Sequence, residues 1–575
     1  MVRRGASGPA PRGVSRGICS SQAAVARAAK HCGWRRPQGQ SRYASAPPPG
    51  PESRLGPRVR RTTASGVKHT VQRRASNRGS ILKPWVHRAS LAPMTARRDH
   101  TDTGRPNYKH TRAGSGATAC RRCDTPQQPG QPQPSLAQHR FRDVVWAGAL
   151  AAVLLLSAMP GAKAKDRYDY AWDLQMKLRF RILPYWFDTA QDTNYGGYVL
   201  ADSATGRGQA KEKQLVSQAR MIWGFAHAHR KGYSDEQRNY LDAAAQGYRF
   251  LQQHFLDRQH GGYFWKTDLQ GRVLNPRKIL YGQAFVIYAL VEYVRAGGPP
   301  EALQAARSLY DTLWQRAHDP KHGGWIEHFE PDWQAILKPM PGVEVEVPGY
   351  KSANTHLHMM EALAELAEVT NDPSIKRALA ETLDLNKRYF YPRQPGRSCF
   401  HRQLNWKPVT DPNSAGLSYG HNVEFAWLML RAEAVLERRP SWAHFEAHLR
   451  HSLRYGYDHQ WGGFYARGLD DQPATDADKI WWVQAEGLAA LTVAVQYRPD
   501  QAYIDALEKL LDFVTRYQAD RDGIWLDTLT ADGKVKNPAK AHNWKANYHD
   551  VRALIMFVEA FPPSEKPVRR RHRGP

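Results

Sequence analysis

The chain has 575 residues and a formal net charge of +28 at pH 7, with 82 Lys and Arg against 54 Asp and Glu. Residues 1–143 hold 28 of the basic and 5 of the acidic side chains, which leaves 54 against 49 for the other 432 residues. This nearly neutral main part excludes the nucleic-acid-binding class that the overall charge suggests, and its single cysteine, Cys399, excludes a disulfide-held fold and argues against a catalytic thiol.

Residues 1–140 are rich in Arg, Ser, Pro and Gly and show no sustained apolar period. Such a segment cannot bury enough apolar area to offset the entropy lost on ordering. Its CxxC pair, Cys120 and Cys123, has no second pair beside it and is weak evidence for a metal site. Two interpretations stay open, a disordered basic arm or translation upstream of the true start, and we favour the second because of the segment that follows.

That segment has the form of a secretory signal peptide. A basic flank at 140–142 precedes an apolar core at 144–159 and an A-x-A site at 162–164. The core is shorter than the roughly 20 residues of a spanning helix. We therefore predict cleavage near Ala164, a periplasmic or secreted protein, and only transient membrane contact through this segment. The basic tail at 564–575 is expected to be disordered.

From Asp166 onward the chain repeats a Gly-Gly-aromatic signature. Clear copies lie at 196–198, 261–263, 323–325 and 462–464, and degenerate ones lie at 396–400 and 523–525. Six copies spaced by about 61 to 73 residues indicate a repeat architecture. The double glycine is typical of a tight turn, and its aromatic flank is typical of a short hairpin.

Two kinds of helix alternate with these signatures. Before each copy lies a helix with one apolar stripe, near 168–187, 241–255, 300–316, 372–390, 441–457 and 501–518. After each copy lies a helix that is apolar all round, at 214–229, 278–294, 350–369, 417–436, 479–497 and 543–561. Six one-sided and six buried helices predict two concentric rings. The fold class is therefore all-α, an (α/α)6 barrel of six repeated helical hairpins spanning 166–563.

Polar groups recur near the start of the buried helices. In the segment 417–430, His421 and Glu424 stand three residues apart ahead of an apolar run. A single buried histidine is more often a hydrogen-bonded core residue, but the buried helices of the other repeats carry polar residues at similar spacing. The aligned positions are Gln218, Gln283, His356, His421, Gln484 and His549. We interpret them as the lining of a cavity at one end of the barrel.

The cavity combines imidazoles, an arginine, amides and indoles, a set that suits sugar faces and hydroxyls. Two histidines that flank a carbon next to a carbonyl can act as base and acid in turn. Return of the proton to the opposite face gives epimerisation, and return to the neighbouring carbon gives aldose–ketose isomerisation. His356 and His358 are two residues apart and face different sides of a helix, so we expect no metal. No cofactor is expected either.

The buried helices carry motifs that resemble a known family. The stretches are QARMIWGFA (218–226), NTHLHMMEAL (354–363), SYGHNVEFAWL (418–428), KIWWVQAEGL (479–488) and NWKANYHDVRA (543–553). With them, residues 166–563 resemble the N-acylglucosamine 2-epimerase superfamily, nearest to its cellobiose 2-epimerase and mannose isomerase-like members. The resemblance implies an (α/α)6 enzyme that acts on C2 of a free reducing sugar through a cis-enediolate.

The resemblance also implies residue roles. His421 and His549 would be the two acid/base groups. His358 would assist ring opening or hold substrate oxygens, Arg220 would stabilise the enediolate, and Glu424 would orient a histidine. The implied sugar-binding residues are Asn354, Tyr281, Trp482, Trp544 and Glu486. Glu361, three residues after His358, is interpreted as a helix-face partner outside the catalytic set.

Two alternatives stay open. An (α/α)6 glycoside hydrolase would use Glu424 and Glu486 as its carboxylate pair, and a non-catalytic sugar-binding barrel would use the same cavity without proton transfer. Asn422 and Asp550-Val551 stand where cellobiose epimerases have Asp and Asn-Gly, so the sugar and the choice between epimerase and isomerase are left open. The oligomeric state is open as well, and a small sugar is the expected partner.

Overall fold

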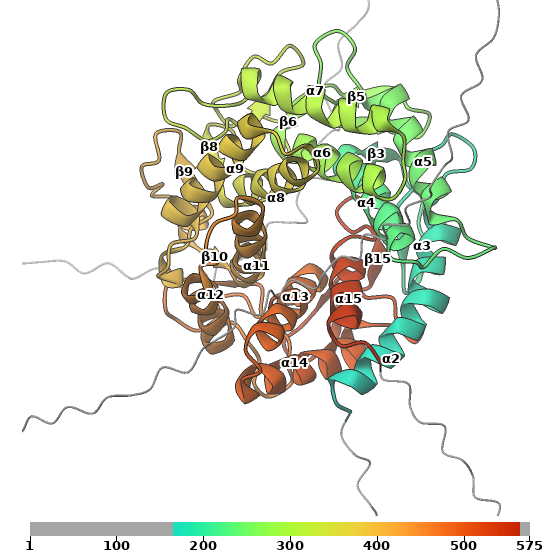
Figure 1. The fold of residues 1–575 in the computed structure, drawn as a ribbon, viewed down its shortest axis with the longest axis vertical. Helices are drawn as coiled ribbons and strands as arrows, with labels where there is room; N and C mark the ends of the chain where they lie inside the picture. The colour runs from blue at the N-terminus through green and yellow to red at the C-terminus, as the bar shows by residue number, and fades with distance from the viewer. Residues whose placement is uncertain (1–164, 564–575) are drawn as a thin grey trace, which may run out of the picture. The chain divides into compact units, whose positions relative to one another are not determined.

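The computed structural model describes residues 165–563, and the predictions for 1–164 and 564–575 lie outside these residues. The described part is a double ring of helices (Figure 1). Its inner ring consists of α4 (Leu215–Arg230), α6 (Leu280–Arg295), α8 (Ala353–Thr370), α11 (Tyr419–Val435), α13 (Trp481–Tyr497) and α15 (His549–Ala560). Each inner helix packs against the next, and α15 contacts α4 to close the ring.

The outer ring carries one helix or helix series per repeat. These are α2 (Arg167–Lys177) with η1 (Leu178–Ile182) and α3 (Leu183–Ala190), α5 (Tyr240–Phe250) with η2 (Leu251–Phe255), α7 (Pro300–Arg316), α9 (Pro373–Leu385) with η3 (Asn386–Phe390), α12 (Trp442–Tyr455), and α14 (Gln501–Phe513) with η5 (Val514–Gln518). The first outer helix, α2, packs against the last inner helix, α15 (Figure 1). The predicted (α/α)6 barrel is confirmed.

Burial explains why the two rings differ in sequence. Every residue of α6 from Leu280 to Tyr293 is buried, whereas α5 buries only one stripe that includes Tyr240, Ala244 and Phe250. An inner helix is covered on all sides and must be apolar all round, while an outer helix needs one apolar face. No helix between residues 165 and 563 combines the length and the hydropathy needed to cross a bilayer.

Short strands link the repeats at one end of the barrel. The strands that precede the inner helices are β3 (Glu212–Gln214), β6 (Lys278–Ile279), β8 (Tyr350–Ser352), β10 (Leu417–Ser418), β12 (Lys479–Ile480) and β15 (Ala539–Ala541). Each pairs antiparallel with a strand of the following repeat, namely β4 (Lys266–Asp268), β7 (His328–Phe329), β9 (His401–Gln403), β11 (Arg467–Gly468), β13 (Thr528–Leu529) and β1 (Asp202–Ser203). The β15–β1 pair joins the last repeat to the first. Three strands, β2 (Gly206–Arg207), β5 (Val273–Asn275) and β14 (Val535–Asn537), extend these pairs.

Five of the six Gly-Gly-aromatic signatures form tight turns closed by an antiparallel bridge, as predicted, whereas the degenerate copy at 396–400 overlaps the short 3₁₀ helix η4 (Pro395–Arg397) and has no such bridge. In the first repeat, Gly196 and Gly197 have φ values of 83° and 65°, in the left-handed region that favours glycine. Asp192 accepts hydrogen bonds from two backbone N–H groups of this turn, and its other oxygen lies 2.8 Å from Nζ of Lys213. Equivalent buried pairs join Lys278 to Asp257, Lys351 to Asp319 and Lys479 to Asp458.

The aligned glutamines do not line a cavity, which corrects the prediction. The side chain of Gln218 donates to the carbonyl of Tyr198 and accepts from its N–H, both at 2.9 Å. Gln283 and Gln484 hold Tyr263 and Phe464 in the same way, and His356 accepts from the N–H of Trp325. These residues are the fourth in their helices, whereas His421 is the third residue of α11. The sequence alignment was therefore displaced by one residue there.

The last inner helix begins later than predicted, at His549 instead of near 543. Residues 542–548 form a loop between β15 and α15 that the other repeats lack, since their helices start directly after the strand. Mutual backbone hydrogen bonds between His542 and Lys545 hold this loop. The loop brings Trp544 to Arg220 on α4.

The buried Lys–Asp pairs make a testable prediction about stability. Replacing Asp257 by Asn leaves the buried Lys278 ammonium without its countercharge, and we expect the free energy of unfolding to fall by about 3–5 kcal/mol. Urea unfolding followed by far-UV circular dichroism measures the loss. Asp532→Asn is the matched control, because its Lys534 partner is exposed and the pair is solvated. Equal losses in the two variants would contradict a stabilising role for the buried pair.

Candidate active site

Polar side chains from all six inner helices meet inside the ring, close to the N-terminal ends of these helices. The residues concerned are Arg220 on α4, Tyr281 on α6, Asn354, His358 and Glu361 on α8, His421 and Glu424 on α11, Trp482 and Glu486 on α13, and His549 and Arg552 on α15. Contacts between neighbouring helices, together with contacts from α15 to α8 and α11, connect nearly all of them. The site is thus built by the whole ring rather than by one repeat.

The Arg552 guanidinium is the centre of this network. It donates to Oε1 of Glu486 at 2.7 Å, to Oε1 of Glu424 at 3.2 Å, and to Glu361. None of the four side chains is more than 3% exposed, so their charges interact in a medium of low polarity. The guanidinium also lies over the Trp427 ring, 4.8 Å from its centroid. One cation from α15 therefore holds carboxyl groups from α8, α11 and α13.

One arginine cannot neutralise three carboxylates, and the pKa values of Glu424 and Glu361 are shifted in opposite directions. Burial, together with the negative charge of Glu486, raises the pKa of Glu424 well above its usual range. Burial also disfavours ionised Glu361, but Arg552 and the hydrogen bond from His358 outweigh it and lower the pKa of Glu361. The surroundings of Glu424 thus favour its protonated form, and its Oε2 has no hydrogen-bond partner among the described residues.

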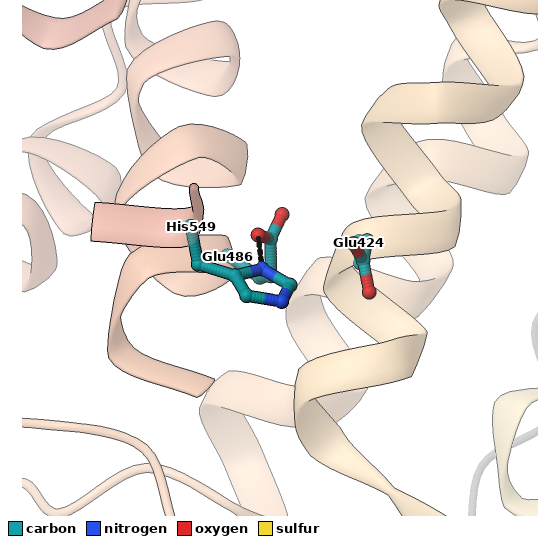
Figure 2. Close-up of side chains that lie close together, drawn as sticks. All are labelled: Glu424, Glu486 and His549. Carbon is teal, nitrogen blue, oxygen red and sulfur yellow. Dashed lines mark hydrogen bonds and ion pairs between the residues drawn. The ribbon is translucent and has the colours of Figure 1, made fainter. Parts of the chain in front are cut away.

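His549 is anchored by Glu486, as Figure 2 shows. Its Nδ1 lies 2.6 Å from Oε1 of Glu486, and the other ring nitrogen points away from this carboxylate. Burial, with Arg220 and Arg552 nearby, lowers the pKa of His549 well below its usual value. Because a carboxylate accepts, the proton of the neutral ring belongs on Nδ1. Nε2 is then left as a free base.

His421 faces the same region from α11. Its ring lies 4.8 Å from the Trp482 ring, whose centroid is 5.9 Å from that of His549. Burial, followed by His358 and Arg467, lowers the pKa of His421 to about 3. Both imidazoles thus lie beside the Trp482 indole. The two histidines belong to different helices, α11 and α15.

His358 forms the third histidine position. Its Nδ1 lies 2.8 Å from Oε2 of Glu361, the helix-face partner predicted for it. Burial lowers the pKa of His358 despite this partner. The ring packs against Phe285 and Tyr281, with centroid distances of 4.7 and 5.3 Å. This places His358 beside the aromatic wall that α6 contributes.

Arg220 links α4 to that wall. It donates to the hydroxyl of Tyr281 and to the carbonyl of Trp544, both at 2.9 Å. Its guanidinium lies over the Phe285 ring at 4.4 Å. Next to it along the rim, Nδ2 of Asn354 donates to Oε1 of Glu346 at 3.0 Å.

The structure changes the roles expected of the two glutamates. Glu424 was expected to orient a histidine, but its hydrogen bond is to Arg552. Glu486 was expected to bind sugar, yet it is fully buried, and Trp427, His549 and Arg552 occupy both of its oxygens. Glu486 is therefore the group that orients a histidine.

Sequence reasoning also missed two groups. The sequence analysis assigned no role to Arg552, although this residue stands three residues after His549 just as Glu424 stands three after His421. That matched spacing was an available clue. Glu346 was missed because it belongs to the extended loop of the third repeat, where its contact with Asn354 has no local sequence pattern.

A metal site is chemically conceivable here. Glu424, Glu486 and His549 (Figure 2) each offer one possible ligand atom, and these three atoms lie within 4.8 Å of one another. However, the Arg552 cation already binds both carboxyl groups. A divalent ion would be repelled by that charge and would compete for the same oxygens. The expectation of a metal-independent site stays a prediction.

Comparisons with known proteins agree with this architecture. Residues 196–553 match the family model described as N-acylglucosamine 2-epimerase (GlcNAc 2-epimerase). The chain is 29% identical over 394 residues to a cellobiose 2-epimerase of Bacteroides fragilis, covering 67% of this chain and 98% of the relative. It is 26% identical to a D-mannose isomerase of Marinomonas mediterranea, covering 66% and 95%. The structure of a cellobiose 2-epimerase from Spirochaeta thermophila superposes with a TM-score of 0.61 at 29% identity, covering 69% and 97%.

The low histidine pKa values can be tested by NMR. We expect the imidazoles of His421 and His549 to stay neutral well below pH 6.5, because burial disfavours the imidazolium. The folded site then binds fewer protons than the unfolded chain, so both histidines lower the stability as the pH falls below 6.5. Titration of histidine-labelled protein measures the ionisation, with exposed His459 as an internal reference. A midpoint for His421 or His549 at or above pH 6.5 would show that burial does not dominate.

Proposed function

The chain belongs to the N-acylglucosamine 2-epimerase family and is a carbohydrate epimerase or isomerase, and we propose that it transfers a proton at C2 of a free reducing sugar through a cis-enediolate. The observation that carries the proposal is that the imidazoles of His421 and His549, each with a lowered pKa, both lie beside the Trp482 indole. Neither epimerisation nor aldose–ketose isomerisation needs an oxidant or a cofactor, because the proton leaves and returns within one sugar.

The first chemical step forms the enediolate. One imidazole takes the proton from C2, and the C–H electron pair forms the C1–C2 double bond while the carbonyl electrons move to the C1 oxygen. Nε2 of His549 suits this step, because Glu486 holds the other nitrogen and stabilises the imidazolium that forms. The developing negative charge needs fixed donors, and Arg220 is preorganised for this by Tyr281 and the Trp544 carbonyl.

The second step returns a proton. Delivery to C2 from the opposite face gives the 2-epimer, and delivery to C1 with loss of the O2 proton gives the ketose. Transfer between two opposed bases requires one of the two to carry a proton, and two neutral histidines lack this proton. Glu424 can store that proton, because its pKa is raised and one of its oxygens lies within 4.8 Å of a ring nitrogen of His549.

The remaining residues suit substrate handling. Opening of the sugar ring requires proton transfer at the ring oxygen and at the C1 hydroxyl. His358 can take part in this transfer, since Glu361 fixes the tautomer of His358 through Nδ1. Trp482, Trp544 and Tyr281 offer aromatic faces for the C–H faces of the sugar. The amide oxygen of Asn354 has no hydrogen-bond partner within residues 165–563 and can accept from a sugar hydroxyl.

A glycoside hydrolase is the weaker hypothesis. It would need one carboxyl group as acid and a second that reaches the scissile bond or its water. Glu486 is fully buried with both oxygens engaged, and Glu424 shares the same arginine. Release of monosaccharide from a β-linked disaccharide, without deuterium at C2 or C1 in heavy water, would favour the hydrolase.

The proposal predicts the effect of removing each base. His421→Asn and His549→Asn should each slow deuterium incorporation from heavy water at C2 or C1 by about 10²–10⁴-fold, because general acid–base catalysis contributes that much. Proton NMR on a panel of cellobiose, mannose and N-acetylglucosamine measures the exchange and identifies the products.

The same substitution at exposed His459 is the control and should leave the exchange unchanged. Folding of each variant is checked by its thermal midpoint. Normal exchange in a folded His421 or His549 variant would refute the proposed role of that residue, and no exchange with any sugar by the native enzyme would favour a non-catalytic sugar-binding barrel.

A further inference from the structure

Two of the three histidines of the site have a carboxylate on their Nδ1 atom, and one does not. Glu486 holds His549, and Glu361 holds His358. Nδ1 of His421 is buried and has no hydrogen-bond partner among residues 165–563. An imidazole without such a partner can move its proton from Nδ1 to Nε2. Nε2 could then no longer act as the base toward the substrate. Something other than a carboxylate must therefore fix this ring.

A small cavity lies directly behind His421. Its volume is about 10 Å³, and its walls come from β10 and the start of α11, the start of α8, and the segment 391–400. A cavity of this size holds about one water molecule, provided that polar groups face it. The polar side chains among its lining residues are Tyr391, Ser398, Ser418, His421 and Asn422.

The lining carries an unusual concentration of unpaired polar atoms. Besides Nδ1 of His421, these are Oη of Tyr391, Oγ of Ser398, and both amide atoms of Asn422. Tyr391, Ser398 and Asn422 are at most 4% exposed. Buried polar atoms are almost always hydrogen-bonded, and leaving each one unpaired costs about 1–3 kcal/mol. Five such atoms belong to residues that line this one cavity, which points to a bound polar ligand.

Packing and capping hold two parts of the lining in place. The Tyr391 ring stacks on Phe425 with centroids 4.4 Å apart, and Ser418 caps α11 by accepting from the N–H of His421. Asn422 follows His421 on the first turn of that helix.

We propose that this cavity binds one water molecule that accepts the Nδ1 proton of His421, and that Asn422, Ser398 and Tyr391 are positioning residues that act on His421 through this water. The inference rests on the proposed function of His421. Its consequence is chemical: the water is neutral, whereas the partner of His549 is a carboxylate. Imidazolium at His421 is less stabilised, so His421 is the weaker base and the stronger acid of the pair. Besides this lining, the titratable groups that face His421 are His358 on α8, Arg467 on β11 and Glu486 on α13.

The test uses the full enzyme with two conservative variants and a matched control. Ser398→Ala and Tyr391→Phe each remove one oxygen from the cavity lining. Ser452→Ala removes an equally buried, unpaired hydroxyl from outer helix α12, away from the cavity. We measure the ¹⁵N shifts of His421, which report the tautomer, together with kcat, KM and the acidic limb of the pH profile.

We expect Ser398→Ala and Tyr391→Phe to mix the two tautomers of His421 and to lower kcat about tenfold, by analogy with the lower end of the loss seen when the hydrogen-bond partner of a metal-bound histidine is removed. KM should change less than twofold, and Ser452→Ala should match the native enzyme in all readouts. A high-resolution crystal structure of the native enzyme should show a water within about 3.2 Å of Nδ1.

A dry cavity, or variants that behave like Ser452→Ala, would overturn the inference. That outcome would leave the proposed function intact as long as His421→Asn abolishes the exchange. Normal exchange in His421→Asn would instead refute the proposed function, whatever the cavity contains. If either cavity variant fails to fold, the other variant and the native crystal structure still decide.

Discussion

The Arg552 guanidinium is the interaction on which the site depends. It binds carboxyl groups from three other inner helices and lies in a fully buried position. A buried charge is costly unless it is paired and hydrogen-bonded, so this cluster fixes the relative positions of α8, α11, α13 and α15. Burial and the negative charge of Glu486 raise the pKa of Glu424. Oε1 of Glu486, which accepts from Arg552, also holds His549, and Oε2 of Glu361 holds His358. Charge balance and catalytic geometry thus come from one network.

The two sides of the inner helices serve different purposes. In four repeats a glutamine or His356 of the inner helix holds the Gly-Gly turn, and a buried lysine in the strand before that helix pairs with the aspartate of the turn. On the side that faces the ring interior, the repeats differ and supply arginine, tyrosine, histidine, glutamate and tryptophan. The regular side explains the stability of the barrel, and the irregular side carries the chemistry. The fourth repeat departs from the regular pattern, with Leu417 where four repeats have lysine, and it is this repeat that carries His421 and its cavity.

The sequence predicted the double ring and most helix boundaries, because the Gly-Gly turns and the apolar patterns are local features. It did not predict which glutamate binds which histidine. Glu424 stands three residues from His421 on one helix, which favoured an intrahelical pair, whereas the observed pair joins Glu486 on α13 to His549 on α15. Nor could the alignment separate the turn-binding position of His356 from the cavity-facing position of His421, one residue apart in the helix. Such distinctions depend on the rotation of each helix about its axis, which periodicity alone does not set to within one residue.

The central claim is that two inequivalent neutral histidines face one carbon of the sugar from opposite sides. The most direct measurement is a crystal structure of the enzyme with an acyclic sugar alcohol, which mimics the opened substrate without reacting. The account predicts that C2 of the ligand lies within about 3.5 Å of Nε2 of both His421 and His549, the distance of a near-attack geometry. A ligand whose C2 lies away from either histidine, or whose C1 oxygen lies between Glu424 and Glu486, would contradict it.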